Sequence, residues 1–278
     1  MILSKDELRK AQLLMLSILK EVHRVCEENG IHYFLSDGTL IGAVRHNGFI
    51  PWDDDIDIGM LREDYEKFCL HAHEILPKNL VIQNEYTDSG YGQCYSKVVL
   101  QGTKWLEHDA KKTSRKYSGL YIDIFVYDKI ATDKKKQKKQ SRIFKFIRFL
   151  IYAKQGYWTT YKNRLKQFIF NVCYGLAKII TLFIPAKALL KQRNKIIFKY
   201  RDLTEDYTIT KFGGSYLKNI NPLESFKNLE LHQFEDTQFY IPCAYDSILR
   251  NLYGDYMKIP DASEIQSHGI EEFDFGEY

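Results

Sequence analysis

The chain has 278 residues, of which 45% are hydrophobic and 14% aromatic, enough to bury a core and too many for an intrinsically disordered chain. Its five cysteines are scattered without metal-ligand spacing, which argues against a zinc module and predicts a reducing, intracellular setting. The net charge of +4 is uneven, because residues 134–201 contain 19 of the 40 Lys and Arg residues and no Asp or Glu, leaving 21 basic against 36 acidic residues elsewhere.

The N-terminal part of the chain predicts helices and strands in alternation. Residues 1–30 predict an amphipathic helix ended by an Asn-Gly pair, since charges interrupt the apolar positions and no signal-peptide core remains. A short strand then leads into a turn at residues 37–39 and the start of a helix. The alternation of Asp and Ile in residues 55–58 predicts a strand, and residues 61–76 predict a further amphipathic helix.

Strand patterns dominate the segment that follows. Residues 80–106 are rich in Val, Ile, Tyr and Gln, and residues 119–128 read GLYIDIFVYD. Strands mixed with helices predict an α/β or α+β sheet domain over roughly residues 20–130.

The basic segment after residue 133 is helical in character and strongly aromatic. Its most apolar part, residues 168–184, has 17 residues interrupted by Asn171 and Lys178, which is short and polar for a membrane-spanning helix. Basic charge combined with apolar and aromatic positions favours docking on an anionic membrane surface. Two alternatives stay open: core-packing helices with a basic rim, and nucleic-acid binding, which we do not expect because no nucleic-acid motif accompanies the charge.

Four carboxylates crowd into the stretch PWDDDIDI, residues 51–58. On one strand face, Asp55 and Asp57 would lie about 6–7 Å apart, close enough to share a cation. A divalent ion such as Mg²⁺ offsets their repulsion, prefers oxygen ligands and binds substrate phosphates. Aspartates that cap a helix or decorate a turn are the alternative interpretation.

Two further features accompany the carboxylates. The turn from Ser36 to Thr39 precedes a helix start, where backbone N–H groups can meet phosphate, although such a turn is also common for structural reasons alone. Asp123 lies between apolar residues in a predicted strand, and its alternative is an edge-strand aspartate that points into water.

The run LSDGTLIGAVRHNGFIPWDDDIDIGM, residues 35–60, followed by REDYEKF, resembles the signature of the LicD family, bacterial relatives of the fukutin-related glycan-modifying proteins. The resemblance continues through GLYIDIFVYD and IPCAYDSILRNLYGDYMKIP and covers most of the chain outside the basic middle. It implies a nucleotidyltransferase-like mixed sheet flanked by helices, with an added basic helical segment. The expected organisation is a catalytic core in residues 1–132, a basic amphipathic helical insertion in 133–202, and a C-terminal part, 203–278, that completes the catalytic domain.

The resemblance also implies an activity. Family members transfer a phospho-substituent, notably phosphocholine from CDP-choline, to a hydroxyl of a teichoic acid, capsule or lipopolysaccharide precursor. The superfamily's catalytic, metal-binding acids map onto Asp55, Asp57 and Asp123. The implied cofactor is Mg²⁺ or Mn²⁺, held by Asp55 and Asp57, with Asp123 placed to orient or deprotonate the acceptor hydroxyl.

Substrate-binding residues are expected around the same motifs: Gly38, Thr39, Arg45 and Lys97. The superfamily's usual Gly-Gly or Gly-Ser turn is replaced here by Asp37-Gly38-Thr39, a kind of departure that the resemblance to this family implies, and this leaves the phosphate contacts open. For Lys97, the alternative is a side chain that is simply solvated. His268 is a further candidate substrate contact, and its alternative is a histidine in the C-terminal tail without a role in the site. The roles of Asp53 and Asp54 stay open between metal support and turn formation.

Partners and rival functions follow from the same interpretation. We expect a CDP-linked donor, a glycan or lipid-linked glycan acceptor and an anionic membrane surface, with no nucleic acid. The expected location is cytoplasmic, at the inner face of the cell membrane. The rivals are a nucleotidyltransferase that attaches NMP from an NTP, and a catalytically silent, membrane-docked scaffold for glycan assembly.

Overall fold

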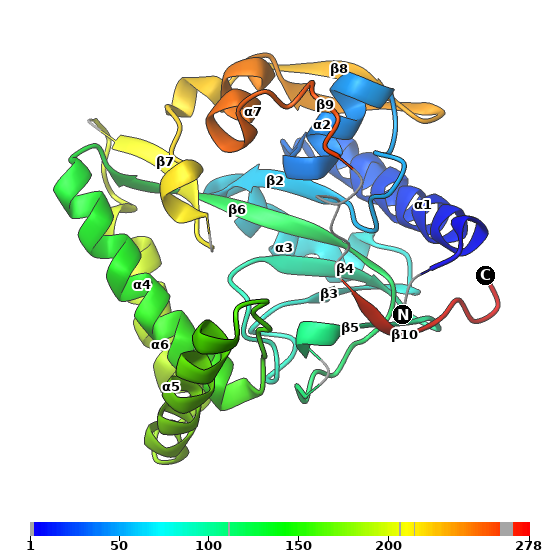
Figure 1. The fold of residues 1–278 in the computed structure, drawn as a ribbon. Coiled ribbons are helices and arrows are strands. Elements are labelled where there is room, and N and C mark those ends of the chain that lie inside the picture. The colour runs from blue at the N-terminus through cyan, green and yellow to red at the C-terminus, as the bar shows by residue number, and fades with distance from the viewer. Residues whose placement is uncertain (1–2, 111, 206, 214, 262–268) are drawn as a thin grey trace.

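The computed structural model describes residues 3–110, 112–205, 207–213, 215–261 and 269–278. Its centre is a six-stranded mixed sheet with the order β1-β2-β6-β4-β3, in which β7 also pairs with β6 (Figure 1). These strands are β1 (Phe34–Leu35), β2 (Asp57–Leu61), β3 (Leu80–Gln83), β4 (Ser96–Leu100), β6 (Tyr121–Ala131) and β7 (Tyr207–Lys211). The expected mixed sheet flanked by helices is therefore confirmed.

Strand β6 organises the sheet because its 11 residues exceed the length of every neighbouring strand. One edge of β6 pairs in parallel with β2. The other edge pairs antiparallel with β4 over its first half and with β7 over its second half. A strand that follows the basic helical segment in sequence thus joins the same sheet as the acidic motif.

Three helices cover the sheet: α1 (Lys5–Asn29), α2 (Asp37–His46) and α3 (Arg62–Ile75). Helix α1 starts with a capping box between Ser4 and Glu7 and ends at Gly30, whose φ of 60° favours glycine. Buried side chains of α1, α2 and α3 form one hydrophobic core with those of β2, β4 and β6. This core supports the strand ends that carry the acidic residues.

The acid-free part of the chain forms helices α4 (Lys134–Gln155), α5 (Arg164–Leu182) and α6 (Ala186–Ile197), which project at the lower left of Figure 1. Asp133 and Asn163 cap α4 and α5 by accepting backbone N–H bonds. The three helices share a small hydrophobic cluster that includes Ile151, Tyr174 and Leu189.

The remaining elements complete the fold around the sheet. They are β5 (Lys104–Glu107), β8 (Leu229–Phe234), β9 (Thr237–Pro242), α7 (Tyr245–Tyr253), β10 (Ile270–Asp274) and the short 3₁₀ turns η1 (His108–Ala110), η2 (Phe198–Tyr200), η3 (Tyr216–Lys218) and η4 (Leu223–Phe226). β8 and β9 form a hairpin, and β10 pairs with β5.

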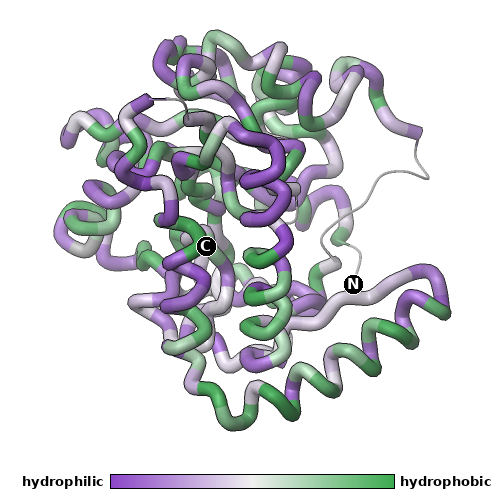
Figure 2. Tube along the Cα trace, turned by 90° about the vertical axis from the view of Figure 1, so that its left-hand side faces the viewer, coloured by the Kyte–Doolittle hydropathy of each residue, from purple (hydrophilic) through white to green (hydrophobic). Residues whose placement is uncertain are grey.

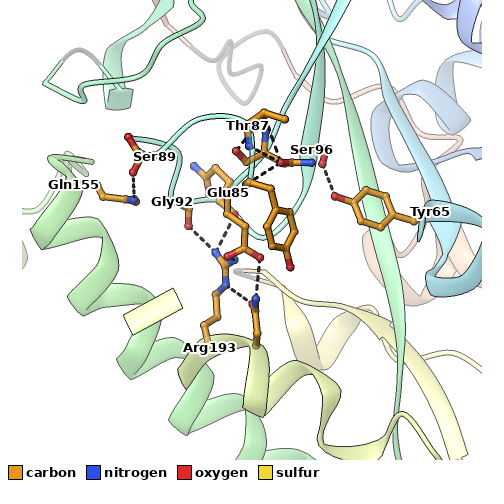
Figure 3. Close-up of polar contacts among 12 residues, drawn as sticks. Tyr65, Glu85, Thr87, Ser89, Gly92, Ser96, Gln155 and Arg193 are labelled. Atoms are coloured by element: carbon orange, nitrogen blue, oxygen red, sulfur yellow. Dashed lines mark hydrogen bonds and ion pairs between the residues drawn. The ribbon is translucent and has the colours of Figure 1, made fainter. Parts of the chain in front are cut away.

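The α4–α6 helices are tied to the loop between β3 and β4, as Figure 3 shows. The buried Arg193 guanidinium lies 2.8 Å from a Glu85 carboxylate oxygen and donates to the Gly92 carbonyl at 3.0 Å. Gln155 of α4 donates to the carbonyl of Ser89 at 3.3 Å. A buried, hydrogen-bonded guanidinium fixes geometry because its donors match the surrounding oxygens.

Candidate functional site

Strand register places three charged residues in one row across the sheet. Asp57 of β2 is paired with Asp123 of β6, and Asp123 is paired with Lys97 of β4. Directly paired residues on neighbouring strands project to the same face, so the three side chains share a surface. Paired residues that are 26 and 66 positions apart in sequence thereby become neighbours.

Hydrogen bonds connect the start of α2 with the start of β2. The Asp57 N–H donates to Thr39 Oγ1 at 2.8 Å, and the Ser36 N–H donates to the Asp57 carbonyl at 3.0 Å. The predicted turn at residues 37–39 is the first turn of α2, with Asp37 in the left-handed region at φ 49°. Thr39, a predicted phosphate contact, therefore uses its hydroxyl to position Asp57.

A second group of carboxylates lies just before β2. Asp53, Asp54 and Asp55 each place an oxygen within 4.8 Å of the others. The expected strand begins only at Asp57, so Asp55 lies in the irregular segment before the strand and not on the strand itself. A Cβ on Gly38 would lie 3.0 Å from an Asp53 carboxylate oxygen, which explains why glycine suits this position.

The two groups of carboxylates interact electrostatically. Burial raises the pKa of Asp57 well above its ordinary value, and Asp55, Asp123 and Asp53 raise that pKa further, while Lys97 opposes them. Crowded carboxylate oxygens are the donor set of a hard divalent cation, so these residues fit Mg²⁺ or Mn²⁺. Sequence reasoning left Asp53 and Asp54 unassigned, and the structure places both beside Asp55.

Lys97 is almost completely buried in a network of ion pairs that connects Asp123 with Glu107. Its Nζ lies 2.9 Å from Glu107 Oε1 and 3.7 Å from Asp123 Oδ1, with 1% of the side chain exposed. Arg115 contacts the other Glu107 oxygen at 3.0 Å, and the Tyr121 hydroxyl also donates to Glu107. The alternative interpretation, in which the Lys97 side chain is solvated, is therefore wrong. Contact with phosphate stays a prediction for Lys97.

The Glu107 network predicts an acid-sensitive contribution to stability. Burial alone would raise the pKa of Glu107, but Lys97 and Arg115 outweigh burial and lower that pKa from 4.5 to about 2. The contribution is present above about pH 4.5 and is lost as the pH falls toward 2, because the unfolded state then binds the proton more tightly. We expect wild type to lose about 3 kcal/mol more than Glu107→Gln between about pH 5 and 2. Urea unfolding across this range measures the difference, and parallel curves would contradict the assignment.

Lys211 is a residue that sequence reasoning missed. It lies on β7, and its ammonium donates to the Asp37 carboxylate and lies 4.0 Å from the centre of the Phe125 ring. Burial lowers the pKa of Lys211 to about 7. Tyr253 donates to the other Asp37 oxygen at 3.3 Å. The position of Lys211 at the end of the strand pattern YTITK gave no signal of a site, and its proximity to the α2 start depends on β7 pairing with β6.

An open cleft of about 340 Å³ is lined by residues that neighbour the carboxylates, although the carboxylates themselves are not part of its lining. Its lining includes Arg45, Trp52, Tyr253 and Tyr256. Burial raises the pKa of Tyr253, and Asp57, Asp55 and Asp53 raise it further, so the phenol lies within electrostatic reach of the acidic groups. Arg45 Nη1 donates to the Tyr256 carbonyl at 2.6 Å and Arg45 Nε donates to His46 Nε2 at 2.9 Å, so the hydrogen bonds that the described residues receive from this guanidinium come from these two nitrogens.

Other predicted site features lie apart from this cleft or outside the described chain. His268 lies outside the described residues. Two larger cavities, of about 590 and 440 Å³, open beside α3 and β3 and between α4 and α6. The predicted carboxylates line none of the three cavities, but only the smaller cleft is lined by Trp52, which precedes Asp53 in sequence, and by Tyr253, which interacts electrostatically with Asp53, Asp55 and Asp57.

Comparison with known proteins adds independent information. A family model described as LicD/FKTN/FKRP, nucleotidyltransferase domain, matches residues 30–174. The lipopolysaccharide cholinephosphotransferase LicD of Haemophilus influenzae is 33% identical over 283 aligned residues, covering 97% of this chain and 98% of that protein. The ribitol 5-phosphate transferase FKRP of Homo sapiens is 50% identical over 40 residues, which cover 14% of this chain and 8% of that protein.

Proposed function

This chain belongs to the LicD/FKTN/FKRP family, and we propose that it is a metal-dependent transferase that moves a phospho-substituent from a CDP-linked donor to a hydroxyl of a cell-surface glycan precursor. Phosphocholine from CDP-choline is the proposed group, because the relative that aligns over nearly the whole chain is a lipopolysaccharide cholinephosphotransferase. The observation that carries the proposal is the register of Asp57 beside Asp123, next to the cluster formed by Asp53, Asp54 and Asp55.

The proposed reaction assigns separate tasks to the acidic residues. Asp55 and Asp57, supported by Asp53, would hold Mg²⁺ or Mn²⁺, which when bound supplies positive charge for the donor diphosphate. Asp123 accepts the proton of the acceptor hydroxyl. The hydroxyl oxygen then forms a bond to the phosphorus that carries choline, the bond from that phosphorus to the CMP oxygen breaks, and CMP leaves with the electron pair. The products are a phosphodiester and CMP.

The cleft beside the carboxylates is the proposed donor site. Trp52, Tyr253 and Tyr256 offer aromatic faces, which bind either a pyrimidine ring by stacking or a quaternary ammonium by cation–π attraction. Arg45 offers a planar cation for a phosphate oxygen. Lys211, which donates to Asp37 at the start of α2, adds a further nitrogen donor on the sheet side of this region.

The purified protein tests the proposal directly. With Mg²⁺, CDP-choline and a lipopolysaccharide acceptor lacking phosphocholine, we expect CMP release measured by chromatography, and a slower or absent reaction with CDP-glycerol and CDP-ribitol. Chelation by EDTA is expected to lower the rate by at least about 100-fold, and added Mg²⁺ or Mn²⁺ to restore it.

Two outcomes of the same assay would contradict the proposal. Pyrophosphate released from an NTP, with no CMP from any CDP-linked compound, would instead support the nucleotidyltransferase. A folded protein that turns over neither donor class would support the silent scaffold. The Mg²⁺-free reaction serves as the control for spontaneous hydrolysis of the donor.

A further inference from the structure

Helix α5 exposes an unusual amount of apolar surface. Nine large apolar side chains on this helix and its C-terminal cap are between 47% and 87% exposed: Leu165, Phe168, Ile169, Val172, Leu176, Ile179, Ile180, Leu182 and Phe183. Figure 2 looks onto the side of the molecule that carries α4–α6, and hydrophobic positions recur along the helix at its lower edge. Scattered single apolar residues are normal on protein surfaces, but a continuous apolar face marks an interaction site.

The exposed face lies opposite the face that packs on the protein. Tyr174, Ala177 and Thr181 are buried against α4 and α6. At 100° per residue these positions share one side of the helix, while most of the exposed apolar positions cover roughly one third of the circumference on the other side. In the described part of the chain, α5 is the one helix long and apolar enough to cross a membrane by length and composition. In the structure, however, α5 lies along the protein surface. Its buried face packs on the protein, and Lys154 Nζ of α4 donates to the Thr181 carbonyl of α5 at 2.8 Å.

Positive charge flanks the apolar face. Lys166 and Lys178 lie on its two sides, and Lys162 and Arg164 precede it, all of them exposed. Residues 134–201 contain no acidic side chain that would offset these charges. An apolar stripe between basic flanks is complementary to a surface with anionic headgroups above an apolar interior.

The helix is also held in a fixed orientation. Arg193 of α6 is anchored on Glu85, Gly92 and Gln93 of the β3–β4 loop, as Figure 3 shows for its contacts to Glu85 and Gly92. Helix α4 shares the hydrophobic cluster with α5 and contacts the same loop through Gln155. A surface bound by α5 therefore lies at a set position relative to the catalytic sheet.

We propose that the exposed face of α5 docks on an anionic phospholipid bilayer, with the helix lying in the plane of the interface and its flanking lysines on the headgroups. The occupant is a lipid surface because the apolar face is bordered by uncompensated positive charge; a second copy of this chain would bring the same positive charges together. This inference is independent of the transfer activity proposed above, since vesicle binding and CMP release are measured separately.

Vesicle co-sedimentation tests the docking face. Wild type is expected to pellet with vesicles of equal parts phosphatidylglycerol and phosphatidylcholine, to bind phosphatidylcholine vesicles much more weakly, and to be released by high salt. The variant Val172→Glu, Leu176→Glu, Ile179→Glu is expected to bind at least about 100-fold more weakly, because it places charge in the apolar stripe. Its matched control makes the same change at exposed apolar positions on other elements: Leu13→Glu, Leu70→Glu and Leu231→Glu.

A second variant set tests the charge. Neutralising three flanking residues is expected to weaken binding to the anionic vesicles by roughly 100-fold: Lys162→Gln, Lys166→Gln and Lys178→Gln. The control neutralises exposed lysines on other surfaces, Lys5→Gln, Lys67→Gln and Lys218→Gln, and is expected to bind like wild type. Circular dichroism and urea unfolding verify that each variant is folded.

Three results would overturn the inference. The first is wild type that stays in the supernatant with the anionic vesicles. The second is equal binding by the α5 glutamate variant and its control. The third is a wild-type protein that is dimeric by analytical ultracentrifugation without lipid and an α5 glutamate variant that is monomeric, with vesicle binding absent from both. That result would assign the α5 face to contact with a second copy of the chain.

Discussion

Replacing Asp57 by asparagine is expected to lower the rate of CMP release by about 1,000-fold or more while the protein stays folded. Asparagine keeps the shape of the side chain but removes the negative charge that a divalent cation requires. Asp57 has a fixed place in the site, since its N–H donates to Thr39 Oγ1 and the residue lies directly opposite Asp123 in the parallel pairing of β2 and β6.

The same substitution has an opposite effect on the stability of the metal-free protein. Burial, Asp55, Asp123 and Asp53 all raise the pKa of Asp57, so its ionised form is disfavoured in the folded state. A neutral amide removes this repulsion, and we expect Asp57→Asn to unfold at the same or a higher urea concentration than wild type in EDTA at neutral pH. Added Mg²⁺ should raise the midpoint of wild type more than that of the variant.

Asp64→Asn is the matched control for this prediction. Asp64 is also a buried acid, but it lies on α3 and contacts Lys67 and His32. Its activity is expected to stay within about twofold of wild type, in line with substitutions outside a site. An Asp57→Asn protein with wild-type activity would move the chemistry away from the β2–β6 pair.

The second large effect is expected for Lys97→Met, which should lower the free energy of unfolding by about 3 kcal/mol or more. Removing the ammonium leaves the largely buried Glu107 carboxylate with Arg115 and Tyr121 as its remaining partners and takes the positive charge away from Asp123. Uncompensated buried charge is costly because the protein interior screens it poorly. Urea unfolding at neutral pH measures the change.

Lys104→Met provides the comparison. Lys104 lies on the neighbouring β5 and pairs with Glu272, but both side chains are about half exposed, so its loss should cost at most about 1 kcal/mol. The double variant Lys97→Met, Glu107→Gln is expected to recover part of the stability lost in Lys97→Met, because it removes the stranded carboxylate. Equal costs at Lys97 and Lys104 would show that burial of the network does not matter.

Local patterns in the sequence determined much of this protein. The 26-residue run from Leu35 to Met60 identified the LicD family, which the comparisons confirmed, and the mixture of strand and helix patterns predicted the mixed sheet. The bounds of the acid-free segment could also be predicted from the sequence, because charge composition does not depend on tertiary contacts. The assignment of Asp55, Asp57 and Asp123 to catalysis stays a prediction, although the sheet register makes Asp57 and Asp123 neighbours.

Only the tertiary structure decided which distant residues meet. Lys97 is buried with Glu107 because β4 pairs with β6 and β5 lies beside it, and Lys211 reaches Asp37 because β7 pairs with the far half of β6. Strand register and the packing of α5 join segments separated by many residues, and each depends on long-range contacts that no local pattern encodes. The sequence by itself therefore located the acidic motif and the basic segment. Tertiary packing decided which charged side chains surround the acidic motif and which face of α5 in the basic segment stays exposed.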